Sequence, residues 1–259
     1  MMHCAPAGND ILFDDSLCEQ GRHFCNKIWN CFRLIKGWEV QEFSSSEVNK
    51  WGIEWFEAVL AKAQTEVADL FSKYRLSEAL MAIYKLFCDE FSGWYLEIIK
   101  PAYGQPIDKA TYEKTIQFMD TMLKLLHPFM PFITEELWQA IEDRKEGESL
   151  MVSPINATQP LHNTTQLLND AAQCFDIISS IRNIRAQKNI SPKEVLTLVC
   201  PEALPAVVVK LANVELAVGA EKSAGSASFI IGTTEYSVPL GKFIKVDEEL
   251  KKPEAELAR

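Results

Sequence analysis

Apolar residues recur at helical spacing through most of the first 143 residues, and this periodicity limits the possible folds more than any other feature. A first helix is predicted from about Ser16 to Lys36, with its apolar residues at i, i+4, i+7 and i+11: Phe24, Ile28, Cys31 and Ile35. Similar patterns predict four more helices, at 47–72, 76–100, 108–127 and 131–143. Because several connections are shorter than about ten residues, we expect an antiparallel helix bundle.

The pattern changes near residue 150. A stretch rich in Thr, Asn and Gln at 156–166 is typical of a linker. A helix is predicted at 167–188 and a short one at 205–211, with β-branched runs at 195–199, 214–218, 229–231 and 236–238. We therefore expect a mainly α fold, in which a helical bundle at 16–155 precedes a small α/β domain at 156–245. Residues 246–259 have helical composition but are too few to pack alone, so we expect a truncated helical segment there.

Charge and composition exclude several classes of protein. The chain has 26 Lys and Arg against 36 Asp and Glu, a formal charge of −10, which argues against non-specific coating of nucleic acid or membranes. Any anion-binding surface must therefore be local. No apolar run is long enough to cross a membrane and no signal peptide is evident, so we expect a cytoplasmic chain without membrane contact.

The seven cysteines include no C-x-x-C pair, and the sequence predicts neither a disulfide framework nor a metal site. Cys18, Cys25 and Cys31 share the first predicted helix, where we expect them to be small core residues. Phosphate-binding loops and hydrolase motifs are also missing from the sequence, so we expect no catalytic residue and no bound cofactor in this chain.

A stripe of cations and amides on the first predicted helix is the most informative polar feature. Arg and Lys neutralise phosphates, Asn can bind base edges or ribose hydroxyls, and exposed aromatic rings can stack on unpaired bases. The residues are Arg22, Asn26, Lys27, Asn30, Arg33 and Lys36, with Trp29 or Phe32 as stacking groups. The pattern suits RNA binding, but composition alone favours the alternative, a solvated helix face with i, i+4 pairs.

A second, weaker cationic cluster lies on the helix predicted at 167–188. Arg182 and Arg185 stand at i, i+3 and follow a run of isoleucines. This spacing suits a phosphate site, but it also suits an ordinary amphipathic helix whose long cationic stems cover apolar surface.

The run from Gly21 to Arg33, G-R-H-F-C-N-K-I-W-N-C-F-R, closely resembles the helix that opens the anticodon-binding domain of valyl-tRNA synthetases, which are class I aminoacyl-tRNA synthetases. Three further stretches resemble the same family in the expected order: 74–79 leading to 94–97, 127–138, and 181–185 with 189–192. The chain departs from the family pattern at His23, where Asn is usual, and at Cys25 and Cys31, where small residues are common.

The resemblance implies which parts of the family are present. Residues 1–15 resemble the junction to the family's catalytic domain, and residues 246–259 stand where its C-terminal coiled coil begins. The H-I-G-H and K-M-S-K-S signatures are missing, as is an editing domain. We therefore expect an excised C-terminal fragment that does not aminoacylate alone, whereas the parent ligase uses ATP and Mg.

The resemblance also implies partners and a binding site. We expect a monomeric chain that binds the anticodon loop of valine tRNA and docks on the missing catalytic domain. The expected tRNA-binding residues are Arg22, Asn26, Lys27, Trp29, Asn30, Phe32, Arg33, Lys36, Arg182 and Arg185. The alternative is a helical module that docks on other proteins without reading RNA. In the segment 127–138 we expect core packing, with Phe129, Phe132 and Trp138 buried.

Overall fold

The computed structural model describes residues 15–156, 158, 164–221 and 225–241. The chain divides into two compact units, Met1–Leu168 and Asn169–Arg259. The first contains a helix bundle and the second a small sheet with helices, which confirms the predicted fold class. The junction predicted at 1–15, apart from Asp15, and the helical segment predicted at 246–259 lie outside the described residues.

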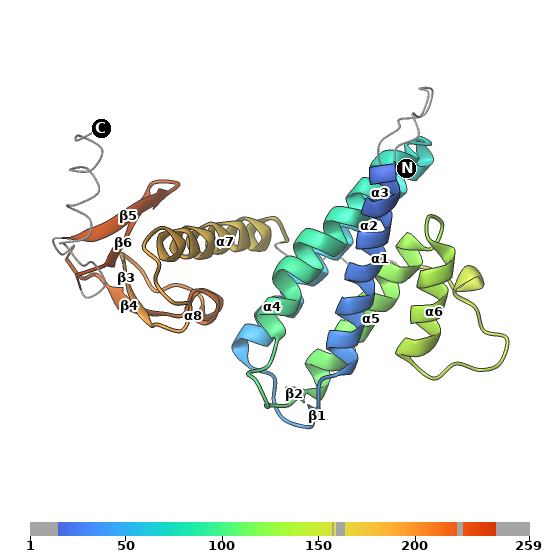
Figure 1. The fold of residues 1–259 in the computed structure, drawn as a ribbon, viewed down its shortest axis with the longest axis horizontal. Coiled ribbons are helices and arrows are strands. Elements are labelled where there is room, and N and C mark those ends of the chain that lie inside the picture. The colour runs from blue at the N-terminus through green and yellow to red at the C-terminus, as the bar shows by residue number, and fades with distance from the viewer. Residues whose placement is uncertain (1–14, 157, 159–163, 222–224, 242–259) are drawn as a thin grey trace. The chain divides into compact units, whose positions relative to one another are not determined.

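Helices account for almost all of the first unit (Figure 1). Its elements in chain order are α1 (Asp15–Lys36), β1 (Val40–Gln41), α2 (Glu47–Ser72), α3 (Leu76–Lys85), the π-helix η1 (Leu86–Tyr95), α4 (Leu96–Ile99), β2 (Ile107–Asp108), α5 (Lys109–Leu126), α6 (Pro131–Ile141) and the 3₁₀ turn η2 (Leu150–Val152). The elements α3, η1 and α4 follow one another without a break, where the sequence predicts a single helix at 76–100. Helix α7 (Thr164–Gln187) contains the boundary between the units.

Asp108 fixes the start of α5 and ties it to the start of α2. Its carboxylate caps α5 by accepting a hydrogen bond from the backbone N–H of Thr111 at 2.9 Å. Asn49 donates to the same carboxylate at 2.9 Å, and the Ser45 hydroxyl donates to it as well. These hydrogen bonds outweigh the effect of burial and hold the pKa of Asp108 below its usual value. The cap is confirmed, whereas the short parallel pairing of β1 with β2 beside it was not predicted.

Aromatic side chains fill the centre of the bundle. The Phe56 ring on α2 lies 4.8 Å from the Tyr95 ring and 5.0 Å from the Phe118 ring, measured between centroids. Gly52 lets α2 approach α4 closely, because a Cβ atom there would lie 2.7 Å from the Ile98 side chain. The close packing of α2, η1 and α5 leaves α1 on the outside of this centre, where one of its faces stays exposed.

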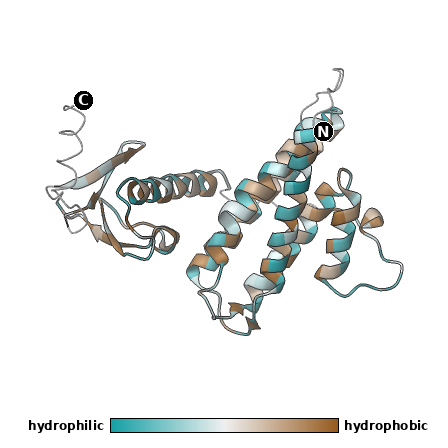
Figure 2. Cartoon of the chain, viewed as in Figure 1, coloured by the Kyte–Doolittle hydropathy of each residue, from teal (hydrophilic) through white to brown (hydrophobic). Residues whose placement is uncertain are grey.

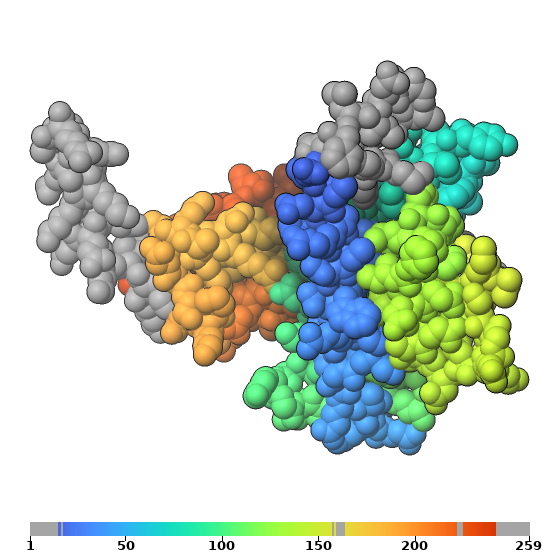
Figure 3. All heavy atoms as spheres, turned by 45° about the vertical axis from the view of Figure 1, so that its right-hand side comes forward, coloured from blue at the N-terminus to red at the C-terminus, as the bar shows by residue number. Residues whose placement is uncertain are grey.

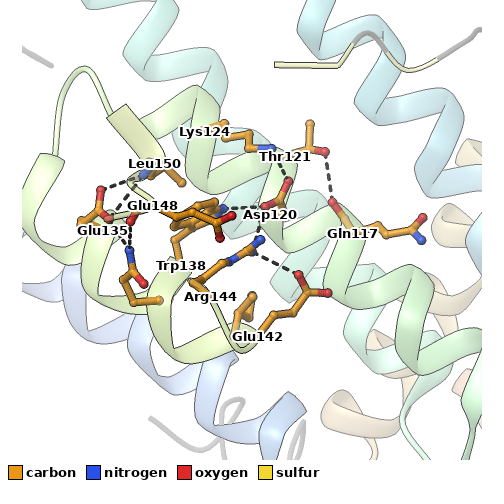
Figure 4. Close-up of polar contacts among 12 residues, drawn as sticks. Gln117, Asp120, Thr121, Lys124, Glu135, Trp138, Glu142, Arg144, Glu148 and Leu150 are labelled. Atoms are coloured by element: carbon orange, nitrogen blue, oxygen red, sulfur yellow. Dashed lines mark hydrogen bonds and ion pairs between the residues drawn. The ribbon is translucent and has the colours of Figure 1, made fainter. Parts of the chain in front are cut away.

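Helix α6 packs on α5 through a polar network as well as apolar contacts (Figure 4). The indole N–H of Trp138 donates to the Asp120 carboxylate at 2.7 Å, and Lys124 lies 2.8 Å from the same carboxylate. The Arg144 guanidinium lies 3.8 Å above the Trp138 ring. Trp138 is buried, as predicted from the sequence.

The prediction for Phe132 was wrong: 90% of this residue is exposed. Helix α6 buries the face that carries Thr134, Leu137, Trp138 and Ile141. Phe132 falls on the opposite side of the helix at 100° per residue, so its ring points to solvent. Phe129 is half-buried, with its ring centroid 5.7 Å from that of Phe71.

The second unit is built on a four-stranded sheet with the order β4-β3-β6-β5. Its elements after α7 are β3 (Leu196–Cys200), α8 (Ala206–Ala212), β4 (Val214–Val218), β5 (Ser226–Ile231) and β6 (Thr234–Pro239). Strands β3 and β4 are parallel and joined through α8, whereas β5 and β6 form an antiparallel hairpin. All four strands and both helices were predicted, with ends that differ by a few residues.

Candidate nucleic-acid interface

Helix α1 has one buried face and one exposed face. The buried residues Phe24, Ile28, Cys31 and Ile35 are at most 5% exposed and face the bundle. The helical repeat places five exposed residues on the opposite side: Arg22, Asn26, Trp29, Asn30 and Arg33. Figure 3 shows α1 along the surface of the first unit, and Figure 2 shows both hydrophilic and hydrophobic residues along this helix. The structure therefore brings these five side chains together on one surface.

Among the residues that the structure describes, the two arginines of this stripe have no buried partner. Arg22 lies 3.6 Å from Glu19 in an ion pair whose side chains are both about two-thirds exposed. A pair this exposed contributes little free energy and exchanges readily for another anion. Arg33 is exposed in the last turn of the helix. Both guanidiniums are thus accessible to a phosphate or a base edge.

Lys27 and Lys36 lie on the flanks of α1 and hold the helix to its neighbours. The Lys27 ammonium donates to the carbonyl oxygen of Cys88 in η1 at 3.1 Å. The Lys36 ammonium donates to the carbonyl oxygen of Ile141 in α6, also at 3.1 Å. Each ammonium has three N–H donors, so both can still contact a ligand at the edge of the stripe. The structure gives them an anchoring role that the sequence did not indicate.

Trp29 and Phe32 form an aromatic pair beside the arginines. Their ring centroids are 5.9 Å apart, with the rings tilted at 48°. Trp29 is 40% exposed, whereas Phe32 is half-buried between Trp29 and the bundle. Trp29 is therefore the ring that is more accessible to a stacking partner, with Phe32 supporting it.

A groove of about 610 Å³ runs along one side of α1. Its first wall carries the side chains of His23, Asn26 and Asn30, and its second wall comes from η1 and α4 with Ser92, Glu97 and Lys100. The sequence does not indicate the second wall, because residues 92–100 are about 65 positions away and fit an ordinary amphipathic helix. Only the folded chain places this carboxylate and ammonium opposite the amides of α1.

The predicted contact of Arg185 with tRNA is corrected by the structure. Arg185 is 5% exposed, and its guanidinium donates to the carbonyl oxygens of Ser191, Ala212 and Asn213 at 2.9, 3.0 and 2.9 Å. Burial also lowers its pKa. Arg182 donates to the carbonyl oxygen of Leu211 at 3.1 Å. Arg185 thus ties α7 to the start of β4, and it presents no open face to a phosphate.

The cysteines of α1 differ in burial. Cys31 is buried as predicted, whereas Cys25 is half-buried and Cys18 is exposed, so the expectation that all three are core residues was wrong. Burial raises the pKa of the Cys31 and Cys88 thiols, which keeps them neutral. Among the residues that the structure describes, no group of His, Cys, Asp and Glu could hold a metal ion. No described helix is long and apolar enough to span a membrane.

Comparison with known proteins places the chain in a family. A family model described as the anticodon-binding domain of tRNA ligase matches residues 54–200, from within α2 to the end of β3. This chain is 60%, 55% and 39% identical to the valine–tRNA ligases of Phocaeicola vulgatus, Bacteroides thetaiotaomicron and Christiangramia forsetii, and each match covers 99% of the chain. The chain spans only 30% of the length of these relatives. The chain therefore belongs to the anticodon-binding domain family of tRNA ligases, within a segment that is homologous to valine–tRNA ligases.

Proposed function

We propose that this chain binds the anticodon loop of valine tRNA through the exposed face of α1 and performs no chemistry itself. The observation that carries the proposal is the register of α1, which buries its apolar face and exposes two arginines, two asparagines and a tryptophan together. A strongly acidic chain has few surfaces that suit a polyanion. This surface combines charge, hydrogen-bonding groups and a ring, as recognition of unpaired RNA requires.

Each side chain has a distinct proposed role. Arg22 and Arg33 neutralise loop phosphates or bind base edges, and Lys27 and Lys36 contact the backbone at the flanks of the stripe. Asn26 and Asn30 donate to and accept from base edges. Trp29, supported by Phe32, stacks on an unpaired base. Arg182 on α7 contributes only through its charge, because its guanidinium already donates a hydrogen bond to the Leu211 carbonyl oxygen.

Within the whole ligase, this binding orients the tRNA for a reaction that takes place elsewhere. Aminoacylation with ATP and Mg belongs to the catalytic domain of the proposed parent enzyme. Anticodon contacts made here convert binding energy into selection of the correct tRNA. The chain alone is proposed to be an inactive monomer that docks on that catalytic domain.

Binding of two RNAs at two salt concentrations tests the proposal. Valine codons begin with G-U, so the anticodon has a central A and a third-position C. The 259-residue chain is expected to bind a valine tRNA transcript more tightly than a transcript with a changed central base, by about 1–3 kcal/mol. Phosphate contacts are salt-sensitive but do not depend on sequence. Equal binding of both transcripts would contradict anticodon reading.

A second candidate function, protein docking, is favoured by a different part of the surface. Phe132 on α6 and both Met151 and Val152 in η2 are at least 79% exposed, and α6 contacts η2. Exposed large apolar residues on neighbouring elements are typical of contact surfaces. A chain with all three residues changed to Ser should keep its affinity for tRNA. If it also keeps its affinity for the separately produced catalytic domain, this docking function is wrong.

A further inference from the structure

The turn between α2 and α3 holds a tyrosine in a strained backbone conformation. Tyr74 has a φ of +57°. Its N–H donates to the Phe71 carbonyl oxygen at 3.0 Å, and the Arg75 N–H donates to the Leu70 carbonyl oxygen at 2.9 Å. This pattern places Tyr74 at the position after a helix end that glycine usually occupies, where a Cβ atom crowds the backbone. The other two described non-glycine residues with a positive φ are asparagines, which tolerate this conformation.

Packing within the described chain does not compensate for this strain. Tyr74 is 83% exposed, so its ring gains little from the fold that strains its backbone. Leu76, the first residue of α3, is also exposed, at 38%. Strained backbone conformations cluster at ligand clamps, active sites and switch regions, where the strain is part of the function. An exposed ring on a strained backbone therefore indicates a contact site.

The α2–α3 turn lies near the exposed apolar residues of α6 and η2. The ring centroids of Phe71 and Phe129 are 5.7 Å apart, which joins the end of α2 to the connection that precedes α6. Phe132 follows in the first turn of α6 and is 90% exposed. The Glu135 carboxylate accepts from the Leu150 N–H at 3.0 Å and holds η2, with its two exposed apolar residues, beside α6. These side chains thus extend the apolar surface of α6 and η2 toward the turn.

The charges around Tyr74 favour a protein partner over RNA. The Lys73 ammonium lies 2.7 Å from the Asp69 carboxylate, and Arg75 forms an ion pair with Glu78. The two cations and two anions cancel, so the turn does not attract a polyanion as an unpaired basic patch does. Tyrosine and arginine are enriched at the centres of protein interfaces. The turn therefore has the composition of a protein contact.

Helix α1 begins at the same end of the bundle as this turn (Figure 1). Phe24 packs on Tyr84 and Phe87, and the Lys27 ammonium donates to the Cys88 carbonyl oxygen, so α1 runs parallel to α3 and η1. A domain that is joined to the chain ahead of α1 is therefore held near the α2–α3 turn. A short tether gives an effective concentration of about the millimolar range, at which a small apolar surface is sufficient for docking.

We propose that Tyr74 anchors the docking of this chain on the catalytic domain of its parent ligase, with Leu76 and Phe132 completing the contact. The inference rests on the proposed function, because it takes the chain as one part of a valine–tRNA ligase. The partner surface has an apolar pocket for the ring and an acceptor for the phenol O–H. Burial of the ring in this pocket offsets the backbone strain, which explains why a tyrosine stands where glycine is usual.

The first test compares the 259-residue chain with the whole ligase, both without tRNA. Tetranitromethane nitrates accessible tyrosine rings, and mass spectrometry measures the rate at each position. In the chain, Tyr74 and Tyr103 are both exposed and should react at similar rates. In the whole ligase, nitration of Tyr74 should slow by about tenfold or more, because its ring is buried in the docked state. Tyr103 is the matched control, because it precedes β2 at the opposite end of the bundle and should keep its rate.

The second test uses Tyr74→Gly in the 259-residue chain. Glycine relieves the strain, so the equilibrium constant for unfolding should fall by about threefold. Tyr74→Ala removes the same ring but keeps a Cβ atom at the strained position, so it should not give this gain. The affinity of both variants for valine tRNA should stay within about twofold of the wild type. A less stable Tyr74→Gly chain would overturn the strain argument.

The outcomes separate docking from RNA binding. Equal nitration of Tyr74 in the chain and in the whole ligase overturns the docking role. A tenfold loss of tRNA affinity in both variants also overturns it, because the ring would then contact RNA. If the whole ligase protects Tyr74 while the chain does not discriminate between tRNA anticodons, docking stands and the proposed anticodon reading fails.

Discussion

Helices α1 and α7 both carry arginines at helical spacing, but the structure places these arginines in opposite environments. On α1, Arg22 and Arg33 lie on the face away from the bundle and are exposed. On α7, Arg185 lies on the buried face beside Ile181 and donates to three carbonyl oxygens. A cation on a helix therefore indicates a ligand site only when it lies on the helix face opposite the buried apolar residues.

Among the changes to cationic residues, the largest effect is expected from Arg185→Ala. This change removes three charge-assisted hydrogen bonds and leaves the carbonyls of Ser191, Ala212 and Asn213 without this donor. We expect the second unit to lose about 3 kcal/mol or more of its free energy of unfolding. Hydrogen exchange of β3 and β4 under native conditions measures the loss directly.

The matched control for this change is Arg33→Ala on α1. Arg33 is exposed and forms no buried hydrogen bond with any described residue, so its loss should alter the free energy of unfolding by at most about 0.5 kcal/mol. Similar destabilisation by the two changes would break the comparison between α1 and α7.

The next largest effect concerns RNA affinity and is expected from Arg22→Ala combined with Arg33→Ala. Both guanidiniums are accessible, so removing them should weaken binding of valine tRNA by about tenfold to a hundredfold. Titrations from low to moderate salt should also show a slope smaller by about one or two units. The free energy of unfolding should barely change. A double variant with wild-type affinity and salt slope would show that α1 is only a solvated helix face.

The sequence was sufficient for the elements and for one side of the interface. The periodicity of residues 24, 28, 31 and 35 predicts both the helix and its exposed stripe, because the buried side determines the outer side. It could not predict the role of Arg185, whose three acceptors are backbone carbonyls of Ser191, after α7, and of Ala212 and Asn213, at the end of α8. It also missed Glu97, which lies opposite α1 only because η1 and α4 pack beside it. Backbone acceptors and walls from distant segments have no signal in local spacing.

A smaller effect is expected from Lys27→Met. Lys27 is half-buried, whereas Arg33 is exposed and Arg185 is buried. Lys27 belongs to the predicted stripe, but its ammonium donates to the Cys88 carbonyl in η1. Methionine keeps much of the apolar stem and removes this hydrogen bond, so we expect a loss of about 1 kcal/mol in the free energy of unfolding. RNA affinity should fall less than in Arg33→Ala. A larger loss of affinity with unchanged stability would identify Lys27 as a contact rather than an anchor.

The smallest effect is expected from Phe132→Ala, which extends the comparison from cations to aromatic residues. Phe132 and Trp138 both belong to the segment 127–138, yet Phe132 is 90% exposed and Trp138 is 3% exposed. Truncating an exposed ring leaves no cavity, so thermal or urea unfolding should change by at most about 0.5 kcal/mol. Trp138→Ala, in contrast, should cost about 3–5 kcal/mol, because it opens a cavity and removes the donor to Asp120. A large loss in Phe132→Ala would mean that angular position fails to separate buried from exposed side chains on α6, and the same reasoning would then lose its force for α1.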